Sequence, residues 1–314
     1  MKHRATPPRL LGLIILLLVT ACGGAPVTPT TTATAPASTS PSGSAQPGTA
    51  AAATTGLPSM DDAEHLSVVY TRPGMDQIAV RRNLPYKSVA GPALAMDVYY
   101  PAGLPSNARR AAVLFVHGGP VPPGVSYKDT RPFVSWGQLV AASGLIGVTF
   151  NWRNFRGLVP QVTDIDDVIR HIRENAAALQ IDRERLGLFA FSGGVAAVVN
   201  KTLQYGAPDG VRCLVAYYGD GGLGLSSLIL KPPRTWDARA TIPPLLIAHG
   251  AKDEFFPIET LERLVGRATA KGAKVELLKH PAGVHGFDVR NDDEQSREII
   301  QKTIAFLQAQ LTPK

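Results

Sequence analysis

The fold is decided by one stretch, Leu186-Gly187-Leu188-Phe189-Ala190-Phe191-Ser192-Gly193-Gly194-Val195-Ala196-Ala197. An apolar run of strand character breaks at Ser192, between small residues, and resumes as a helical pattern. In such a strained turn, bulk two residues before or after the serine would collide where the strand and the helix cross. The stretch therefore predicts an exposed serine hydroxyl at a helix N-terminus, where the dipole favours developing negative charge.

Apolar runs on both sides of this stretch predict the rest of a sheet. They lie at residues 112–116, 146–150, 186–191, 214–218, 245–248 and 275–278. Because these runs are continuous rather than alternating, they indicate strands covered on both faces. Residues 78–80 and 96–100 look like an antiparallel hairpin that enters the sheet.

Amphipathic segments separate these runs. Apolar residues recur at helical spacing over residues 165–179, 261–268 and 300–311, and Pro257 and Gly272 mark the ends of the second segment. The alternation of strands and helices predicts an α/β fold, with a mostly parallel central sheet and helices on both faces.

Two polar loops after the later strands carry candidate partners for Ser192. A serine hydroxyl is a weak nucleophile, so it requires a base, and the base requires an acid that orients it. The first loop reads His249-Gly250-Ala251-Lys252-Asp253-Glu254-Phe255-Phe256-Pro257, and the second reads His280-Pro281-Ala282-Gly283-Val284-His285-Gly286-Phe287. A third loop, His117-Gly118-Gly119-Pro120, follows an early strand and offers backbone N–H groups to an oxyanion.

These segments resemble, in the expected order, the oxyanion loop, nucleophile elbow, acid loop and histidine loop of the α/β-hydrolase fold. The resemblance covers roughly residues 78–311. It implies that Ser192 is the nucleophile, Asp253 the acid and His285 the base. It also implies an oxyanion hole built from the N–H of Gly118 or Gly119 together with that of Gly193. The chain departs from the usual G-x-S-x-G pattern at Ala190, which adds one methyl group.

Within that fold the chain is most similar to the esterase-lipase and dienelactone-hydrolase-like branches. Dienelactone hydrolases use a cysteine nucleophile, so Ser192 argues instead for carboxylesterase chemistry through an acyl-enzyme. The resemblance implies that neither a metal nor an organic cofactor is required. Two apolar segments, residues 121–136 and 221–236, are candidate walls for a small or medium ester, and no long lid insertion is visible.

Several alternatives stay open at this stage. Asp220 occupies the place that some relatives use for the acid, and Asp253 with Glu254 is also compatible with a solvated turn before a helix. Residues 192–194 are compatible with a plain strand-to-helix turn. A non-catalytic binding protein keeps the same fold, and a prolyl-oligopeptidase-like peptidase shares the order of the three side chains.

The N-terminus reads as an export signal followed by a tether. Lys2, Arg4 and Arg9 precede a short apolar run, and Val19-Thr20-Ala21-Cys22 resembles the lipobox of bacterial lipoproteins. Residues 1–21 are therefore expected to be a signal peptide, with a lipid on Cys22; an ordinary secretory leader with an incidental cysteine is the alternative. Residues 22–60, rich in Thr, Ala, Pro and Ser, are expected to be a disordered linker, and residues 61–314 the hydrolase domain.

Composition and charge limit the kinds of partner that the protein could bind. The 314 residues are 45% hydrophobic, which is ample for a buried core. The formal charge of +7 falls to +4 once the three cations of the leader are removed, too little to indicate nucleic acid. We expect the protein to cross the cytoplasmic membrane and to stay on a bacterial membrane through Cys22. Cys213 is then the other cysteine of the chain, so no disulfide forms within the domain, and the sequence leaves the oligomeric state open.

Overall fold

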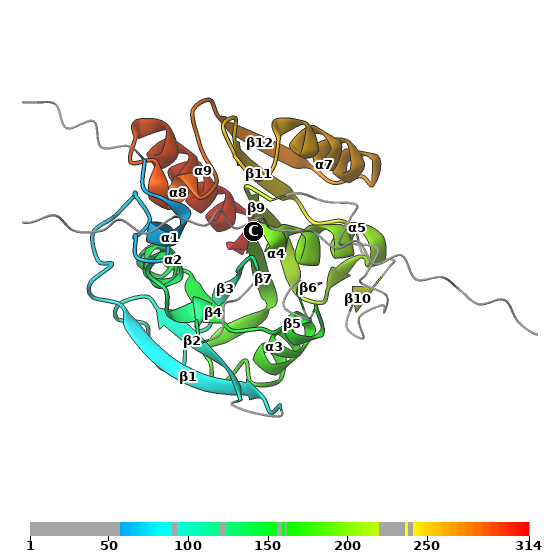
Figure 1. Ribbon diagram of the computed structural model, residues 1–314. Helices are drawn as coiled ribbons and strands as arrows, with labels where there is room; N and C mark the ends of the chain where they lie inside the picture. The colour runs from blue at the N-terminus through cyan, green and yellow to red at the C-terminus, as the bar shows by residue number, and fades with distance from the viewer. Residues whose placement is uncertain are drawn as a thin grey trace, which may run out of the picture. The chain divides into compact units, whose positions relative to one another are not determined.

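The apolar runs form one mixed sheet in the computed structural model, which describes residues 57–89, 93–119, 124–155, 159–160, 162–219, 236–237 and 241–313. The eight strands follow the order β1-β2-β4-β3-β7-β9-β11-β12 (Figure 1). Cys22, the leader, Asp220 and most of the wall expected at residues 221–236 lie outside the described residues.

Six of these strands are parallel, which confirms the predicted sheet. They are β3 (Arg110–Val116), β4 (Ile146–Phe150), β7 (Ile181–Phe191), β9 (Val211–Tyr217), β11 (Leu245–Gly250) and β12 (Val275–His280). The predicted hairpin is also confirmed, as β1 (Ala79–Lys87) pairs antiparallel with β2 (Leu94–Tyr100), which in turn pairs antiparallel with β4. Two short pairs, β5 (Asn154–Phe155) with β6 (Val159–Pro160) and β8 (Ala207–Pro208) with β10 (Trp236–Asp237), lie outside this sheet.

Two apolar cores cover the two faces of the sheet. One core contains residues of α3 (Val162–Glu174) and α7 (Ile258–Ala270), and the other contains residues of α2 (Arg131–Ala142) and α9 (Glu294–Leu311). Figure 1 shows the two pairs of helices on opposite sides of the strands. The three predicted helices correspond to α3, α7 and α9, although α3 ends at Glu174, before the turn that leads into β7.

The helix α2 was not expected, because residues 121–136 read as an apolar wall. Gly137 and Pro132 interrupt its pattern, but Pro132 stands in the first turn, where no backbone donor is needed. None of the helices in the described part of the chain is both long and apolar enough to cross a lipid bilayer.

The segment before the sheet packs onto α2 and the short helix α8 (Phe287–Arg290). Its first turn, α1 (Met60–Ala63), is closed by a capping box between Ser59 and Asp62. The N–H of Val68 donates to Ser135 Oγ at 2.9 Å, and the N–H of Val69 donates to the Asp288 carbonyl at 2.8 Å. These bonds bring the start of the described chain to the edge where the parallel strands end.

The backbone of helix α2 packs directly against that of β4, and glycine makes this possible. A Cβ added at Gly147 would lie 2.8 Å from the carbonyl oxygen of Gly137 and 3.0 Å from its Cα. These are backbone atoms of a helix, which cannot move aside as the end of a flexible side chain can. The glycine therefore sets the distance between the helix and the sheet.

We predict that Gly147→Ala destabilises the protein by about 1–3 kcal/mol, because the new methyl group forces α2 away from β4. Gly266→Ala in α7 is the matched control, since a Cβ there meets nothing within 4 Å. It should stabilise the helix by about 0.5–1 kcal/mol. Urea unfolding of the two variants measures both changes, and equal stabilities would contradict this packing.

Candidate active site

Ser192 stands between β7 and α4 (Gly193–Val195), in a backbone conformation that few residues adopt. Its φ is 49° and its ψ is −127°. Such a conformation costs on the order of 1–3 kcal/mol, so the surrounding contacts must hold it. The Ser192 N–H donates to the carbonyl of Tyr217 on the neighbouring strand at 3.0 Å, which fixes the turn to the sheet.

Small neighbours allow this turn, as the sequence predicted. A Cβ at Gly194 would lie 2.6 Å from the carbonyl oxygen of Val116 and 2.7 Å from that of His117. Ala190, in place of the usual first glycine, is fully buried in β7 and pairs with Val116 and Ala216. The extra methyl group of Ala190 is therefore accommodated within the sheet.

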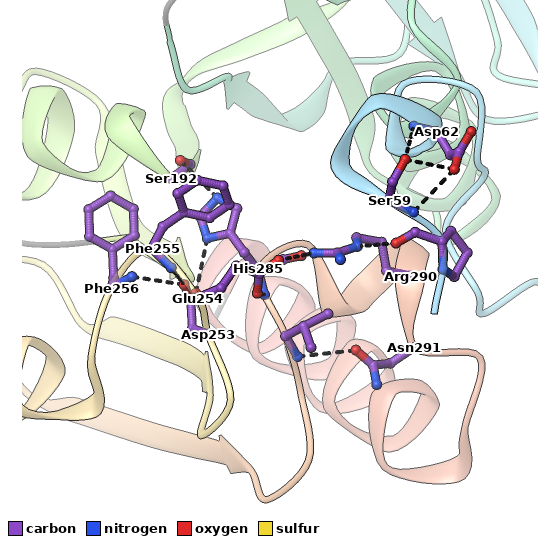
Figure 2. A network of polar contacts seen from close by, with 12 residues as sticks. Ser59, Asp62, Ser192, Asp253, Glu254, Phe255, Phe256, His285, Arg290 and Asn291 are labelled. Carbon is purple, nitrogen blue, oxygen red and sulfur yellow. Dashed lines mark hydrogen bonds and ion pairs between the residues drawn. The ribbon is translucent and has the colours of Figure 1, made fainter. Parts of the chain in front are cut away.

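His285 and Asp253 meet Ser192 at the carboxyl edge of the sheet (Figure 2). The Ser192 hydroxyl lies 3.0 Å from His285 Nε2, and His285 Nδ1 lies 3.0 Å from Asp253 Oδ2. The other oxygen of Asp253 accepts the N–H groups of Phe255 and Phe256, each at 2.9 Å. The carboxylate is thus fixed, and it can hold the imidazole with Nε2 free to accept the serine proton.

Aromatic rings surround the imidazole of His285. The rings of Tyr218 and Phe255 approach it edge-on, with centroids 4.8 Å and 4.9 Å away, and the ring of Phe256 lies at 5.6 Å. The His285 side chain is consequently only 6% exposed and that of Asp253 is 0% exposed. Exclusion of water strengthens the hydrogen bonds between these groups.

The glycines proposed for the oxyanion lie against the serine. A Cβ on Gly118 would approach the Cβ of Ser192 to 2.8 Å, and a Cβ on Gly193 would lie 3.5 Å from the Gly119 nitrogen. His117 Nδ1 donates to the Gly118 carbonyl at 2.6 Å. Since the carbonyl and N–H of one planar peptide point in opposite directions, this bond directs the Gly119 N–H away from His117.

His117 itself stays neutral. Burial lowers its pKa to about 4, although the bond to Gly118 opposes the shift. Its ring stacks on Tyr127 with centroids 4.7 Å apart. A neutral, immobilised imidazole suits a residue that positions a peptide group rather than one that exchanges protons.

Glu254 and Arg290 hold the backbone of His285, and the sequence analysis missed this role (Figure 2). Glu254 Oε2 accepts the His285 N–H at 3.0 Å, and Arg290 Nη1 donates to the His285 carbonyl at 2.7 Å. Arg290 also pairs with Glu254, and its Nε donates to the Pro58 carbonyl at 2.7 Å. Partial burial opposes the effect, but the bonds from Arg290 and His285 lower the pKa of Glu254.

The other histidines of the two loops make contacts away from Ser192. His249 contacts the carbonyl of Phe256 at 2.8 Å beneath the acid loop, and His280 contacts Asp293 and Ser296 at 3.0 Å each. Asp220, the rival acid, is not among the described residues. Within the described ranges, no group of three or more His, Cys, Asp or Glu side chains could hold a metal ion.

A cavity of about 320 Å³ opens beside Ser192 and His285. Aromatic side chains form much of its wall: Tyr127, Phe133, Trp136, Phe191 and Tyr218. The first three belong to the segment that the sequence indicated as a wall. The arrangement places a hydroxyl, a nitrogen that can accept its proton, backbone N–H groups and an apolar space beside one another.

Two family models match the chain. The model of the Dienelactone hydrolase family matches residues 154–311, a range that contains Ser192, Asp253 and His285. A second model, described as BD-FAE, matches residues 96–204. Among curated proteins, the chain is similar to the uncharacterized peptidase YuxL of Bacillus subtilis, at 24% identity over 241 residues. The match covers 67% of this chain and 36% of that protein, so the chain spans about a third of the relative's length.

Solved structures show the same fold. The native esterase Est2 of the Planctomycetes species Thermogutta terrifontis is 21% identical, with a TM-score of 0.58, and the match covers 77% of this chain and 96% of that one. The propionate-bound form matches at 21% identity and a TM-score of 0.58, over 77% and 98% of the two chains. At this identity the likeness establishes the fold.

We predict that Arg290→Gln slows the phosphonylation of Ser192 by a fluorophosphonate about 10-fold, because the backbone of His285 loses its carbonyl donor and shifts. Arg297→Gln on α9 is the control, since that exposed side chain pairs only with Asp292 among the described contacts. Labelling rates are compared for the fraction that circular dichroism shows to be folded. Equal rates in the two variants would contradict the positioning role.

Proposed function

We propose that this chain, which belongs to the Dienelactone hydrolase family, is a serine esterase that cleaves a small or medium ester through an acyl-enzyme on Ser192. The observation that carries the proposal is the continuous relay from Ser192 Oγ to His285 Nε2 and from His285 Nδ1 to Asp253, with both distances at 3.0 Å. The esterase neighbours support ester bonds as the substrate class.

In the proposed first step, Ser192 Oγ bonds to the ester carbonyl carbon as its proton passes to His285 Nε2. The N–H groups of Gly119 or Gly118 and of Gly193 stabilise the negative oxygen of the tetrahedral intermediate. The carbon–oxygen bond to the alcohol then breaks, and the leaving oxygen takes the proton from His285. Asp253 holds the tautomer and stabilises the transient imidazolium.

The second step repeats this sequence with water. Water gives a proton to His285 Nε2 and bonds to the acyl carbon, and the bond to Ser192 Oγ breaks as that oxygen recovers the proton. The free acid leaves. Cys213 takes no part, because it is fully buried in β9 and burial raises the pKa of its thiol.

A peptidase is the second candidate, favoured by the likeness to the B. subtilis peptidase. The same relay serves amide hydrolysis if the site protonates an amine leaving group. The esterase neighbours and the cavity of about 320 Å³ favour esters as the main substrate.

We predict that short p-nitrophenyl esters are hydrolysed and aminoacyl p-nitroanilides are not. Ser192→Ala should abolish ester hydrolysis and fluorophosphonate labelling with little change in melting, whereas Ser88→Ala, at an exposed position, should alter neither. If the anilides are hydrolysed in preference to the esters, the protein is a peptidase and the esterase proposal is wrong. Absence of both activities and of labelling would leave a binding protein.

Two acid variants complete this test. Asp253→Asn should lower kcat by roughly 10³- to 10⁴-fold, as expected when the imidazole loses its orienting carboxylate. Asp220→Asn is the matched variant for the rival acid, and its kcat should stay near that of the parent. The reverse pattern would transfer the role to Asp220.

The proposed location is the outer side of a bacterial membrane, through a lipid on Cys22. The basic leader, its apolar run and the lipobox-like Val19-Thr20-Ala21-Cys22 support this proposal. The uncharged tether that follows would let the domain stand away from the lipid headgroups.

We predict that Cys22→Ser abolishes incorporation of a labelled fatty acid and releases the protein from membranes. Cys213→Ala retains Cys22, so it should keep both the label and the membrane association. Because the chain has two cysteines, these variants assign the label to one of them. Membrane association that survives Cys22→Ser would overturn the anchor.

A further inference from the structure

The cavity beside Ser192 carries two carboxylates. Glu64 and Asp288 both line it, and among the described residues of its wall His285 is the sole side chain with a basic nitrogen. Neither carboxylate forms an ion pair with a lysine or arginine in the described part of the chain. The wall therefore offers carboxyl oxygens to whatever enters it.

Asp288 presents an oxygen that lacks a hydrogen-bond donor. Asp288 is only 1% exposed, and its Oδ2 accepts the Trp136 Nε1–H at 2.7 Å. Oδ1 has no hydrogen bond within the described residues, although the Tyr218 hydroxyl lies beside the carboxyl. Burial raises the pKa of Asp288, and the nearby Trp136 and Tyr218 donors oppose that shift. A buried acceptor left in this state gains free energy when a ligand supplies a donor.

Glu64 places a second carboxylate on the same wall from another part of the chain. It follows α1, and its carbonyl accepts the N–H of Arg131 at 3.1 Å, which fixes the segment to the start of α2. Its carboxylate lies beside the Tyr127 hydroxyl. Burial, and then this neighbouring carboxylate, raise the pKa of Tyr127 to about 12. Glu64 is half-buried, so its charge is only partly screened by water.

The aromatic rings of the wall also favour a cation in the cavity. The rings of Tyr127, Phe133 and Phe191 line the same space as the carboxylates. Aromatic faces attract cations, most strongly where water is excluded, and they give no such advantage to a carboxylate. A neutral hydroxyl would satisfy Asp288 but would gain little from the charge of Glu64.

We infer that this cavity selects esters whose acyl or alcohol part carries an ammonium group, which Glu64 and Asp288 recognise through charge and hydrogen bonding within the aromatic wall. Esters that carry a carboxylate are excluded by the same two groups. The inference rests on the proposed esterase function and specifies its substrate class.

The test measures kcat/KM for p-nitrophenyl esters whose acyl chains have equal length and end in trimethylammonium, dimethylammonium, tert-butyl, hydroxymethyl or carboxylate. A parallel series of acetate esters varies the alcohol in the same way, and a pH-stat records its hydrolysis. In at least one series we expect both ammonium esters to exceed the tert-butyl ester about 10-fold, with the carboxylate ester slowest.

The ratio of kcat/KM for the ammonium ester to kcat/KM for the tert-butyl ester is then compared between variants. Each enzyme is thereby its own reference. Glu64→Gln and Asp288→Asn should each lower this ratio several-fold. Glu174→Gln, at the end of α3, removes one exposed charge on the edge opposite the active site and should keep the parent ratio.

Four results would overturn the inference. A ratio of one or less in both series would refute the cationic substrate while leaving the esterase intact, and a ratio that neither carboxylate variant lowers would refute the role of these residues. Faster hydrolysis of the hydroxymethyl ester than of both ammonium esters would identify a neutral donor instead. Failure to hydrolyse any ester would refute the proposed function as well.

Discussion

The crossing of β7 with the helix that follows Ser192 is the constraint on which the site depends. The serine backbone adopts φ 49°, a conformation that needs support from its surroundings. Support comes from backbone packed against backbone: a Cβ at Gly194 would meet the Val116 carbonyl oxygen at 2.6 Å, and one at Gly219 would meet the Ser192 carbonyl oxygen at 2.4 Å. The tight crossing raises the hydroxyl out of the sheet and brings it to the loops after β3, β11 and β12.

Those loops bring together groups that lie far apart in the chain. Parallel strands end at the same edge, so Asp253 after β11 and His285 after β12 reach Ser192 without distortion of the sheet. Arg290 then links the His285 backbone to Glu254 and to Pro58, in the segment before the sheet. The same segment supplies Glu64 to the cavity, so the start of the domain shapes both the histidine loop and the space beside it.

Much of this arrangement could be predicted from the sequence, because the signals are local. Continuous apolar runs identified six parallel strands, and the small residues around Ser192 identified the strained turn. The acid and histidine loops were predicted from their resemblance to those of the α/β-hydrolase fold and from their position after strands. Helix α2 was missed because its apolar face resembled a substrate wall, and in the structure Phe133 and Trp136 belong to both the core and the cavity.

The contacts that the sequence did not reveal join residues without any local pattern. Glu254 resembled a solvated neighbour of Asp253, and its bond to the His285 N–H arises only because the two loops fold against each other. The orphaned oxygen of Asp288 depends on the distant Trp136, which binds the other oxygen of the same carboxylate. Such pairings depend on the packing of the whole sheet and its helices.

Mass spectrometry of the protein after reaction with a fluorophosphonate tests whether the packing at one edge of the sheet activates a single hydroxyl. We expect one adduct per chain, mapped by peptide fragmentation to Ser192. An adduct on another side chain, or an unmodified Ser192 in folded protein, would contradict it.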